Sequence, residues 1–289
     1  MTQNKDYVKF DGGTWMTRVL PGQEPILPVY DEDRFDYIMN IMSRRIGKGG
    51  IVAVLNARGN NDPNGSDFRY EWLFDEGWKK NNGNISPMGR EARAFCTLPQ
   101  DICVVKGQEV WTPEAGLIFY GGPHGKNVNS KKIPEALIEG CEDGCICGIS
   151  KILDQEGLLR ILQSSKLWNT IDFIVTYRGT RFGLTNPNKL EENFYKEFNS
   201  KGNAFGVVAM SKGYNLQDLL EMPTVGTSYT RISPVSCDHV NFLENLRNEI
   251  RTTSLEDVHG RPLYSGVLTH GLNMVLDKAR GYKHTIMRD

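Results

Sequence analysis

The order of apolar segments in the second half of the chain constrains the fold most strongly. From residue 151 onward, candidate helices alternate with candidate strands, and the connections between them are short. This alternation favours an α/β or α+β fold, in which flanking helices pack on a mixed sheet. Along the whole chain, helices are expected over 132–140, 154–166, 189–198, 215–221, 238–251 and 264–279, and strands over 102–105, 117–120, 171–177, 204–210 and 227–232.

The first half is richer in glycine and proline, which predicts a more irregular, β-rich lobe. Alternating residues around Gly12-Gly13 predict an N-terminal β-hairpin over 7–19. A helix is expected to run up to Ile46, and the continuous apolar run 51–55 predicts a strand covered on both faces. The polar loop 56–67 that follows is long enough to suggest a functional role.

The change from a glycine- and proline-rich first half to a second half of alternating helices and strands predicts two lobes. The β-rich lobe with its early helix would cover 1–150, and the α/β lobe would cover 151–289. Because no flexible linker marks the boundary, a single domain fits the sequence as well.

Charge and apolar patterning narrow the class of protein. The chain has 34 Lys and Arg against 35 Asp and Glu, and this near-zero balance excludes a globally basic nucleic-acid-binding protein. Its start shows no signal-peptide pattern, and no stretch approaches the ~18 apolar residues of a membrane helix. We therefore expect a soluble, cytoplasmic protein with no membrane partner.

The six cysteines are expected to be reduced, because so few in 289 residues cannot form a disulfide scaffold. Three of them lie in mixed apolar surroundings that are typical of buried free thiols. These are Cys96, Cys103 and Cys237.

The other three cysteines, Cys141, Cys145 and Cys147, fall within seven residues. Their spacing matches no standard zinc or iron–sulfur ligand set, so no metal is expected. Acidic neighbours at 142 and 143 are expected to raise the thiol pKa values and make the thiols less reactive.

The strongest candidate for chemistry is the end of the expected strand 171–177. Arg178 would place a permanent cation at the sheet edge, and Gly179 would let a phosphate approach the backbone closely. Such an arginine can grip a pyrophosphate or carboxylate with two hydrogen bonds. The alternative is that Arg178 pairs with a carboxylate and Gly179 only ends the strand.

The order of elements over 154–214 resembles the core of the ADP-ribosyltransferases. In that family a strand ending in Tyr-Arg-Gly holds NAD, and a Ser-Thr-Ser strand supports the nicotinamide pocket. Tyr177, Arg178 and Gly179 match the first motif, and Ser211 matches the last serine of the second. The first two residues of the second motif are replaced here by Ala and Met.

The resemblance also implies a glutamate that stabilises an oxocarbenium-like transition state. Glu256 could fill this role, although Ser254 stands two positions before it, where the family usually has Glu or Gln. The resemblance thus implies Arg178, Ser211 and Glu256 as catalytic residues and an NAD-like nucleotide as cofactor, with Tyr177 and Gly179 in contact with it.

A second candidate for phosphate binding is the segment LIFYGGPHGK, residues 117–126. Gly121 and Gly122 could present backbone N–H groups to a phosphate, and Lys126 could add a cation. The segment lacks the spacing of a Walker loop. A tight glycine-rich turn is the alternative.

Two classes of function stay open, and whether the chain is an enzyme is undecided at this point. The first is a nucleotide-binding enzyme, such as a transferase of ADP-ribosyl groups or an enzyme that cleaves NAD. The second is a non-catalytic assembly or inhibitory component, for example a viral one, that acts through protein–protein interaction. The partner would accordingly be a small-molecule nucleotide or a protein, and a homo-oligomer is compatible with both classes.

Overall fold

The structure is a computed structural model of the 289-residue chain. The residues that it describes are 6–15, 46–58, 95–98, 102–121, 128, 130–179, 185–187, 189–200, 205–210, 228–237 and 241–260. Among these residues, no helix is long and apolar enough to cross a membrane. The helices expected over 215–221 and 264–279, and all but the last residue of the early helix, lie outside the described residues.

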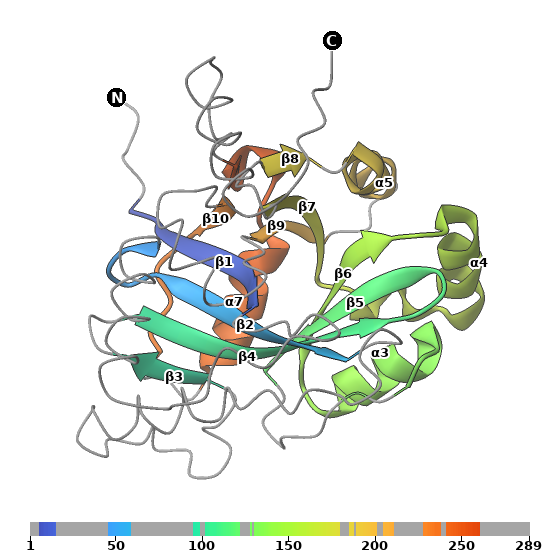
Figure 1. Ribbon diagram of the computed structural model, residues 1–289, viewed down its shortest axis with the longest axis horizontal. Helices are drawn as coiled ribbons and strands as arrows, with labels where there is room; N and C mark the ends of the chain where they lie inside the picture. Colours follow the sequence, from blue (N-terminus) through green and yellow to red (C-terminus); the bar gives the residue numbers. More distant parts are fainter. Residues whose placement is uncertain are drawn as a thin grey trace, which may run out of the picture.

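The described strands form one mixed sheet (Figure 1). They are β1 (Val8–Trp15), β2 (Ile51–Arg58), β3 (Phe95–Leu98), β4 (Ile102–Trp111), β5 (Ala115–Tyr120), β6 (Ile146–Ile152), β7 (Phe173–Gly179), β8 (Thr185–Pro187), β9 (Gly206–Met210), β10 (Ser228–Ile232) and β11 (Val258–Gly260). Within the described part of the chain, the order along the main path is β11-β10-β1-β2-β4-β5-β6-β7-β8; β3 pairs with β4, and β9 with β7. The expected α/β class with a mixed sheet is confirmed.

Besides β11, six of the described strands run in the same direction. β1, β2 and β4 are parallel neighbours, and so are β6, β7 and β9. β5 pairs antiparallel with both β4 and β6, which therefore point the same way. We call the edge where these six strands end the carboxyl edge and the edge where they begin the amino edge. Ligands of α/β sheets commonly bind beyond the carboxyl edge.

The sheet is curled, so that β9 packs against β1 and β10. Glycine is needed at position 12 for this close approach, because a Cβ atom there would overlap the Val208 side chain of β9. The backbone N–H of Ala209 donates a hydrogen bond of 2.9 Å to Thr230 Oγ1 and so joins β9 to β10. The curled sheet thus has an inner face enclosed by its own strands and an outer face.

The inner face is closed at the amino edge by α7 (Phe242–Arg251). Apolar side chains of α7 at a spacing of four residues pack into the inner cluster of buried side chains. They are Phe242, Leu246 and Ile250, and they meet Phe10, Ile51, Cys103, Ile146, Phe173 and Val208 among others. A Cβ atom at Gly206 would overlap the Ile250 carbonyl group, so the start of β9 lies directly against the end of α7.

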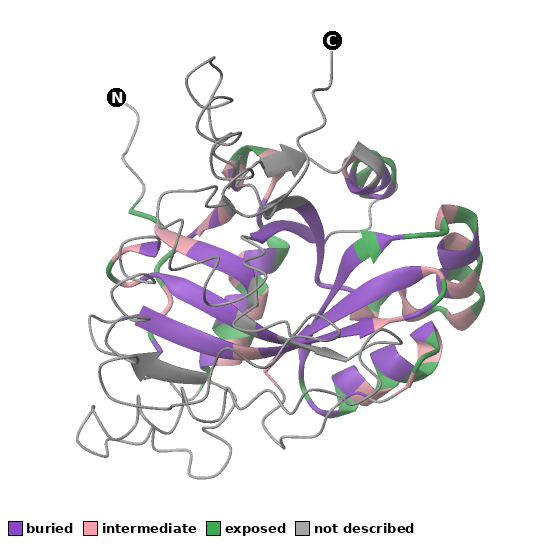
Figure 2. Ribbon diagram, in the orientation of Figure 1, coloured by how far each residue is buried: buried purple, intermediate pink, exposed green. Residues whose placement is uncertain are grey.

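Helices α3 (Ile133–Glu142), α4 (Gln155–Ser165) and α5 (Lys189–Asn199) cover the outer face, together with the short helix η2 (Leu167–Thr170). Figure 2 shows buried strands between helices whose far sides are exposed. The Asp154 side chain caps α4 by accepting a hydrogen bond of 3.0 Å from Gly157 N. The helices expected over 132–140, 154–166, 189–198 and 238–251 are therefore confirmed, the last with a later start.

Two details of the first half differ from expectation. Gly12 and Gly13 lie within β1, whose sheet neighbours are β2 and β10, so the predicted N-terminal hairpin is wrong. β6 was not expected, and residue 150 lies inside it. Because β6 pairs with β5 and β7, one sheet runs through the position of the expected lobe boundary.

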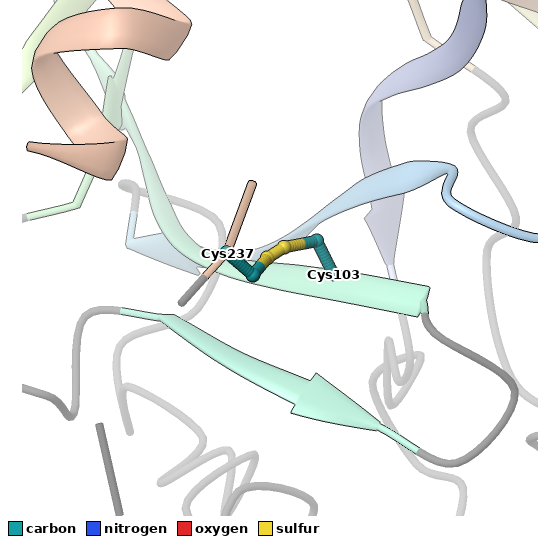
Figure 3. The surroundings of a disulfide bond; sticks show 2 residues. All are labelled: Cys103 and Cys237. Atoms are coloured by element: carbon teal, nitrogen blue, oxygen red, sulfur yellow. A yellow bond between two sulfur atoms is a disulfide. The ribbon is translucent and has the colours of Figure 1, made fainter. Parts of the chain in front are cut away.

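The expectation of free thiols is wrong for two cysteines. Cys103 on β4 and Cys237 beyond the end of β10 form a disulfide, although 134 residues separate them (Figure 3). Their Cα atoms are 6.1 Å apart, and both residues are buried in the inner cluster. The curl of the sheet brings them together, which a local sequence pattern does not reveal. The side chain of Cys96 lies outside the described part of the structure.

Candidate functional site

A buried carboxylate on the inner face is the first feature of the candidate site. Glu109 lies near the carboxyl end of β4, and only 1% of its surface is exposed. Ser150 Oγ of β6 donates a hydrogen bond of 2.6 Å to Glu109 Oε1. The other oxygen, Oε2, is buried and has no hydrogen-bond partner among the residues that the structure describes. Burying a charged oxygen without a hydrogen-bond partner costs free energy. Because no contact in the described structure offsets this cost, the burial of Oε2 is not explained by the stability of the fold.

A buried tyrosine lies beside this carboxylate. Tyr120 on β5 donates a hydrogen bond from its hydroxyl to the Gly12 carbonyl oxygen of β1. Burial raises the pKa of Tyr120 well above its ordinary value, and the Asp11 and Glu109 carboxylates raise it further. The phenol is therefore a neutral donor at physiological pH that joins β5 to β1, and it cannot serve as a base there.

The Tyr-Arg-Gly segment lies at the carboxyl edge. Tyr177, Arg178 and Gly179 are the last three residues of β7, and the Cα of Arg178 pairs with that of Met210, the last residue of β9. The expected position of the arginine at the end of a buried strand is thus present in the backbone. Its side chain, that of Tyr177 and the whole of Ser211 lie outside the described part of the structure.

The glycine-rich segment lies at the opposite edge. β5 runs against its neighbours, so Tyr120 pairs with Ile146, the first residue of β6, and Gly121 follows at the amino edge. A Cβ atom at Gly121 would meet Leu243 of α7. The structure therefore does not bring Gly121 together with the end of β7. Gly122 and Lys126 lie outside the described residues.

Glu256 lies on the outer side of the sheet, in the short helix η3 (Leu255–Asp257). It is exposed, and a hydrogen bond with Ser254 lowers its pKa. Burial raises the pKa of Tyr195 of α5, whose ring packs in the outer cluster, and the charge of Glu256 raises it further. The capping box between Ser254 and Asp257 that the sequence indicates is present. Glu256 and Glu109 thus face opposite sides of the sheet.

Sequence reasoning missed Glu109 and Tyr120. The available signal was the polar pair Gln108-Glu109 in a strand whose other residues, apart from Lys106 and Gly107, are apolar. Gln108 is satisfied, because its side chain forms hydrogen bonds of 2.8 and 2.9 Å with the backbone of Val128. Glu109 differs in keeping one oxygen without a partner, which only the three-dimensional structure reveals.

The three clustered cysteines are free thiols: Cys141 lies in the last turn of α3, Cys145 in the turn that follows, and Cys147 in β6. Burial and the Asp143 carboxylate raise the pKa of Cys145 to about 12. Cys141 differs from expectation, because a hydrogen bond with Cys147 lowers its pKa to about 7. The predicted rise in the thiol pKa is therefore wrong for Cys141. Within the described parts of the chain, no three His, Cys, Asp or Glu side chains are grouped so that they could hold a metal ion.

No protein-family model matches this chain, and no curated protein matches it. Among solved structures, it is similar to a two-domain protein from Bacteroides vulgatus containing a "predicted PHP-like metal-dependent phosphoesterase". The TM-score is 0.50 and the identity 9%; the match covers 90% of this chain and 66% of the other, so the chain spans just under two thirds of that protein. It is also similar to PsfC from Pseudomonas syringae, with a TM-score of 0.45, 8% identity, and coverage of 95% and 99%. At this identity, the likeness to the first protein shows the fold alone.

Proposed function

We propose that the chain is an enzyme that acts on a phosphate-bearing ligand of the nucleotide or NAD type. The ligand would bind at the carboxyl edge, with its reacting end toward Glu109. The observation that carries the proposal is the buried, unpartnered oxygen of the Glu109 carboxylate, near the end of β4. Charged groups that are buried without a stabilising contact inside the protein are frequent at catalytic centres.

Each residue of the proposed site has a role that follows from its chemistry. Ser150 holds one oxygen of Glu109, so the other is oriented to accept a proton or a hydrogen bond from a reacting hydroxyl or water. The same fixed anion would stabilise an oxocarbenium-like centre if the reaction is cleavage of NAD or ADP-ribosyl transfer. Arg178 would bind the phosphate, Gly179 would permit its approach, and Ser211 would support the pocket.

We assign the carboxylate role to Glu109 in preference to Glu256. A fixed anion is more effective when it is held in a water-excluded site, and Glu256 is exposed on the outer side of the sheet. Tyr120 would remain protonated beside Glu109 and keep the inner face closed by its bond to Gly12. The glycine-rich turn at Gly121 lies at the other edge and has no part in this site.

Phosphate-ester chemistry is one form of this proposal. The Bacteroides vulgatus protein of similar fold is described as containing a predicted PHP-like metal-dependent phosphoesterase. Since the described residues include no group of three side chains suited to a metal ion, we assign no metal ligand and derive no step through a metal. Phosphate transfer and NAD cleavage share the need for a phosphate clamp and a fixed carboxylate, and their products distinguish them.

The first test measures binding. The full chain is heated with NAD, ADP-ribose, AMP, ATP or inorganic phosphate, and the melting temperature is recorded for each. A ligand present at 100 times its Kd stabilises the fold by about 2.7 kcal/mol, which a melting curve resolves. A wild-type chain that none of these compounds stabilises contradicts the enzyme proposal and favours the assembly or inhibitory alternative.

The second test measures turnover, with free nicotinamide and inorganic phosphate as separate readouts. Removal of a preorganised group of this kind lowers kcat by about a hundredfold or more, so Glu109→Gln should lose most of the activity. Glu156→Gln, on the exposed side of α4, is the matched control and should retain it. If Glu256→Gln abolishes turnover instead, the carboxylate belongs to Glu256, as the resemblance to the ADP-ribosyltransferases implies.

A further inference from the structure

The face of β1 and β10 that points away from the inner cluster carries two cations side by side. Lys9 of β1 and Arg231 of β10 are directly opposite each other in the antiparallel pairing. Their neighbours Phe10 and Ile232 belong to the inner cluster, and successive side chains of a strand point to opposite faces. Lys9 and Arg231 therefore share the outward face of β1, β10 and β11, which we call the basic face. Like charges in directly opposite positions destabilise a sheet, so the stability of the sheet does not explain this pairing.

Each of the two cations lies over a tyrosine ring. The Lys9 Nζ atom is 4.9 Å from the centre of the Tyr229 ring, and the Arg231 guanidinium carbon is 4.9 Å from the centre of the Tyr7 ring. Cation–π contacts of this length hold a charged side chain in place and leave its charge intact. The two cations are thus fixed next to each other and keep the capacity to bind an anion.

A histidine extends the basic face onto β11. His259 is directly opposite Tyr229 in the pairing of β10 with β11, and the two rings stack with their centres 5.4 Å apart. Burial lowers the pKa of His259, and the Arg231 guanidinium lowers it further, against the effect of the Asp257 carboxylate. The imidazole is therefore neutral at physiological pH, and one of its nitrogen atoms can accept a proton.

Two nitrogen atoms of the basic face lack hydrogen-bond partners. Arg231 Nε and His259 Nε2 are buried, and neither has a partner among the residues that the structure describes. Both residues are only half-buried as a whole, so these atoms lie close to the surface. Arg231 and His259 are diagonal neighbours on paired strands, which typically places such residues about 7–8 Å apart. A bound group with several oxygen atoms can bridge this distance and satisfy both nitrogen atoms.

The charges and the two unpartnered nitrogen atoms together fit a phosphate monoester. At neutral pH such a group carries a charge of about −1.5 to −2 and has three acceptor oxygens. Two adjacent cations match this charge, and the proton that the monoanion retains can be shared with His259 Nε2. A phosphodiester matches less well, because it carries a single charge and no such proton.

Stacking on a nucleic-acid base is disfavoured on this face. Because β10 lies between β1 and β11, the Tyr229 ring is contacted by Lys9 from one neighbouring strand and by His259 from the other. Proteins that bind single-stranded nucleic acid need open aromatic rings on which successive bases stack. The observations therefore favour a small ligand with a terminal phosphate.

We propose that the basic face is a binding site for the phosphate group of a small phosphate monoester. The Arg231 guanidinium and the Lys9 ammonium donate hydrogen bonds to its oxygens, and His259 Nε2 contacts a further oxygen. Tyr7 and Tyr229 hold the two cations in position. The site lies on the opposite face of the sheet from Glu109, and it does not depend on the function proposed above.

The experiment records the side-chain nitrogen NMR signals of His259 in the isotope-labelled full chain, and His259→Gln identifies these signals. The probes are inorganic phosphate, glycerol phosphate, glycerol, and a single-stranded oligothymidylate without a terminal phosphate, at neutral pH and constant ionic strength. We expect inorganic phosphate and glycerol phosphate to shift the Nε2 signal in a saturable way. Glycerol and the oligonucleotide should leave the signal unchanged.

Arg231→Gln should weaken the affinity for glycerol phosphate by at least about tenfold, because it removes a charge-assisted hydrogen bond. Arg231→Lys keeps the charge and should recover part of the affinity. Lys151→Gln, which changes an exposed cation of β6, is the matched control and should bind as the wild type does. The melting curve of each variant shows that it is folded.

Glu109→Gln separates this site from the one on the inner face. The variant should keep the His259 response to phosphate, so a failure of the function proposed above would leave this result intact. Loss of the response in Glu109→Gln would place the ligand on the inner face and overturn the proposal. A wild type without a saturable shift, an equal response to the oligonucleotide, or an unchanged affinity in Arg231→Gln would overturn it as well.

Discussion

Arg251 Nε lies 2.6 Å from Asp172 Oδ1, which joins the end of α7 to the residue before β7. Arg247 Nε is 3.5 Å from the other oxygen, and that oxygen also accepts a hydrogen bond of 2.8 Å from Cys147 N. The one carboxylate therefore connects α7, β6 and β7 at the amino edge. Burial nevertheless raises the pKa of Asp172, because desolvation outweighs the Cys147 N–H and the two guanidinium groups.

The raised pKa of Asp172 predicts how stability depends on pH. An acid whose pKa is higher in the folded state binds its proton more tightly there than in the unfolded state. Its contribution to the free energy of unfolding is therefore complete at a pH below the unfolded-state pKa of 3.8. The contribution declines as the pH rises through the folded-state pKa. Urea unfolding of the wild type and Asp172→Asn isolates this contribution. The wild-type advantage should shrink as the pH rises above the unfolded value of 3.8. An advantage that grows over this range would show that the two arginines outweigh burial.

Tyr120→Phe should destabilise the fold more than the same change at Tyr195, whose hydroxyl makes a hydrogen bond that is only partly buried. The variant leaves the buried carbonyl oxygen of Gly12 without the Tyr120 hydroxyl, and an unsatisfied buried group costs about 1–3 kcal/mol. Tyr195→Phe is the matched control, because its hydroxyl accepts a hydrogen bond of 2.8 Å from Asn199 in a partly buried place. The free energies of unfolding in urea give both costs, and equal costs would contradict a special role for Tyr120.

The alkylation of Cys141 should follow a titration near neutral pH. With a pKa of about 7, its rate with iodoacetamide should reach half of its maximum near that pH. Cys147→Ala removes the hydrogen bond that lowers this pKa, so the half-maximum should move upward toward the ordinary value of 9.0. Cys145, with a pKa of about 12, should remain unlabelled over the same range. An unchanged midpoint in Cys147→Ala would show that the contact does not control Cys141.

Much of the fold follows from local sequence patterns. Amphipathic spacing indicates α3, α4, α5 and α7, and continuous apolar runs indicate β2, β7 and β9. The local patterns do not reveal β6, because Gly148, Ser150 and Lys151 interrupt its apolar run and the cysteine spacing directs attention to metal binding instead. Its place in the sheet depends on pairing with β5 and β7, and the sequence of β6 itself carries no information on these partners.

The candidate site depends more than the secondary structure does on contacts between distant parts of the chain. Glu109 meets Ser150 across 41 residues, and Tyr120 meets Gly12 across 108. No motif spacing links such pairs, so the sequence shows that Glu109 follows an apolar run but does not show that one of its oxygens lacks a partner among the described residues. The motif at Arg178 was visible, since it depends on consecutive residues at a strand end.

Glu109→Gln should make the chain more stable and less active. The change removes a buried charge that keeps one hydrogen bond, and it leaves a side-chain oxygen that Ser150 can still bind. Because the neutral amide is less costly to bury, the free energy of unfolding should rise by about 1–2 kcal/mol. Gln108→Ala is the opposing control: it loses both bonds to Val128, which should cost about 1–3 kcal/mol, and it keeps the Glu109 carboxylate. Urea unfolding at pH 7 and turnover with the ligand found by thermal shift measure the two effects. A Glu109→Gln variant that is less stable and fully active would show that the carboxylate supports the fold and takes no part in the chemistry.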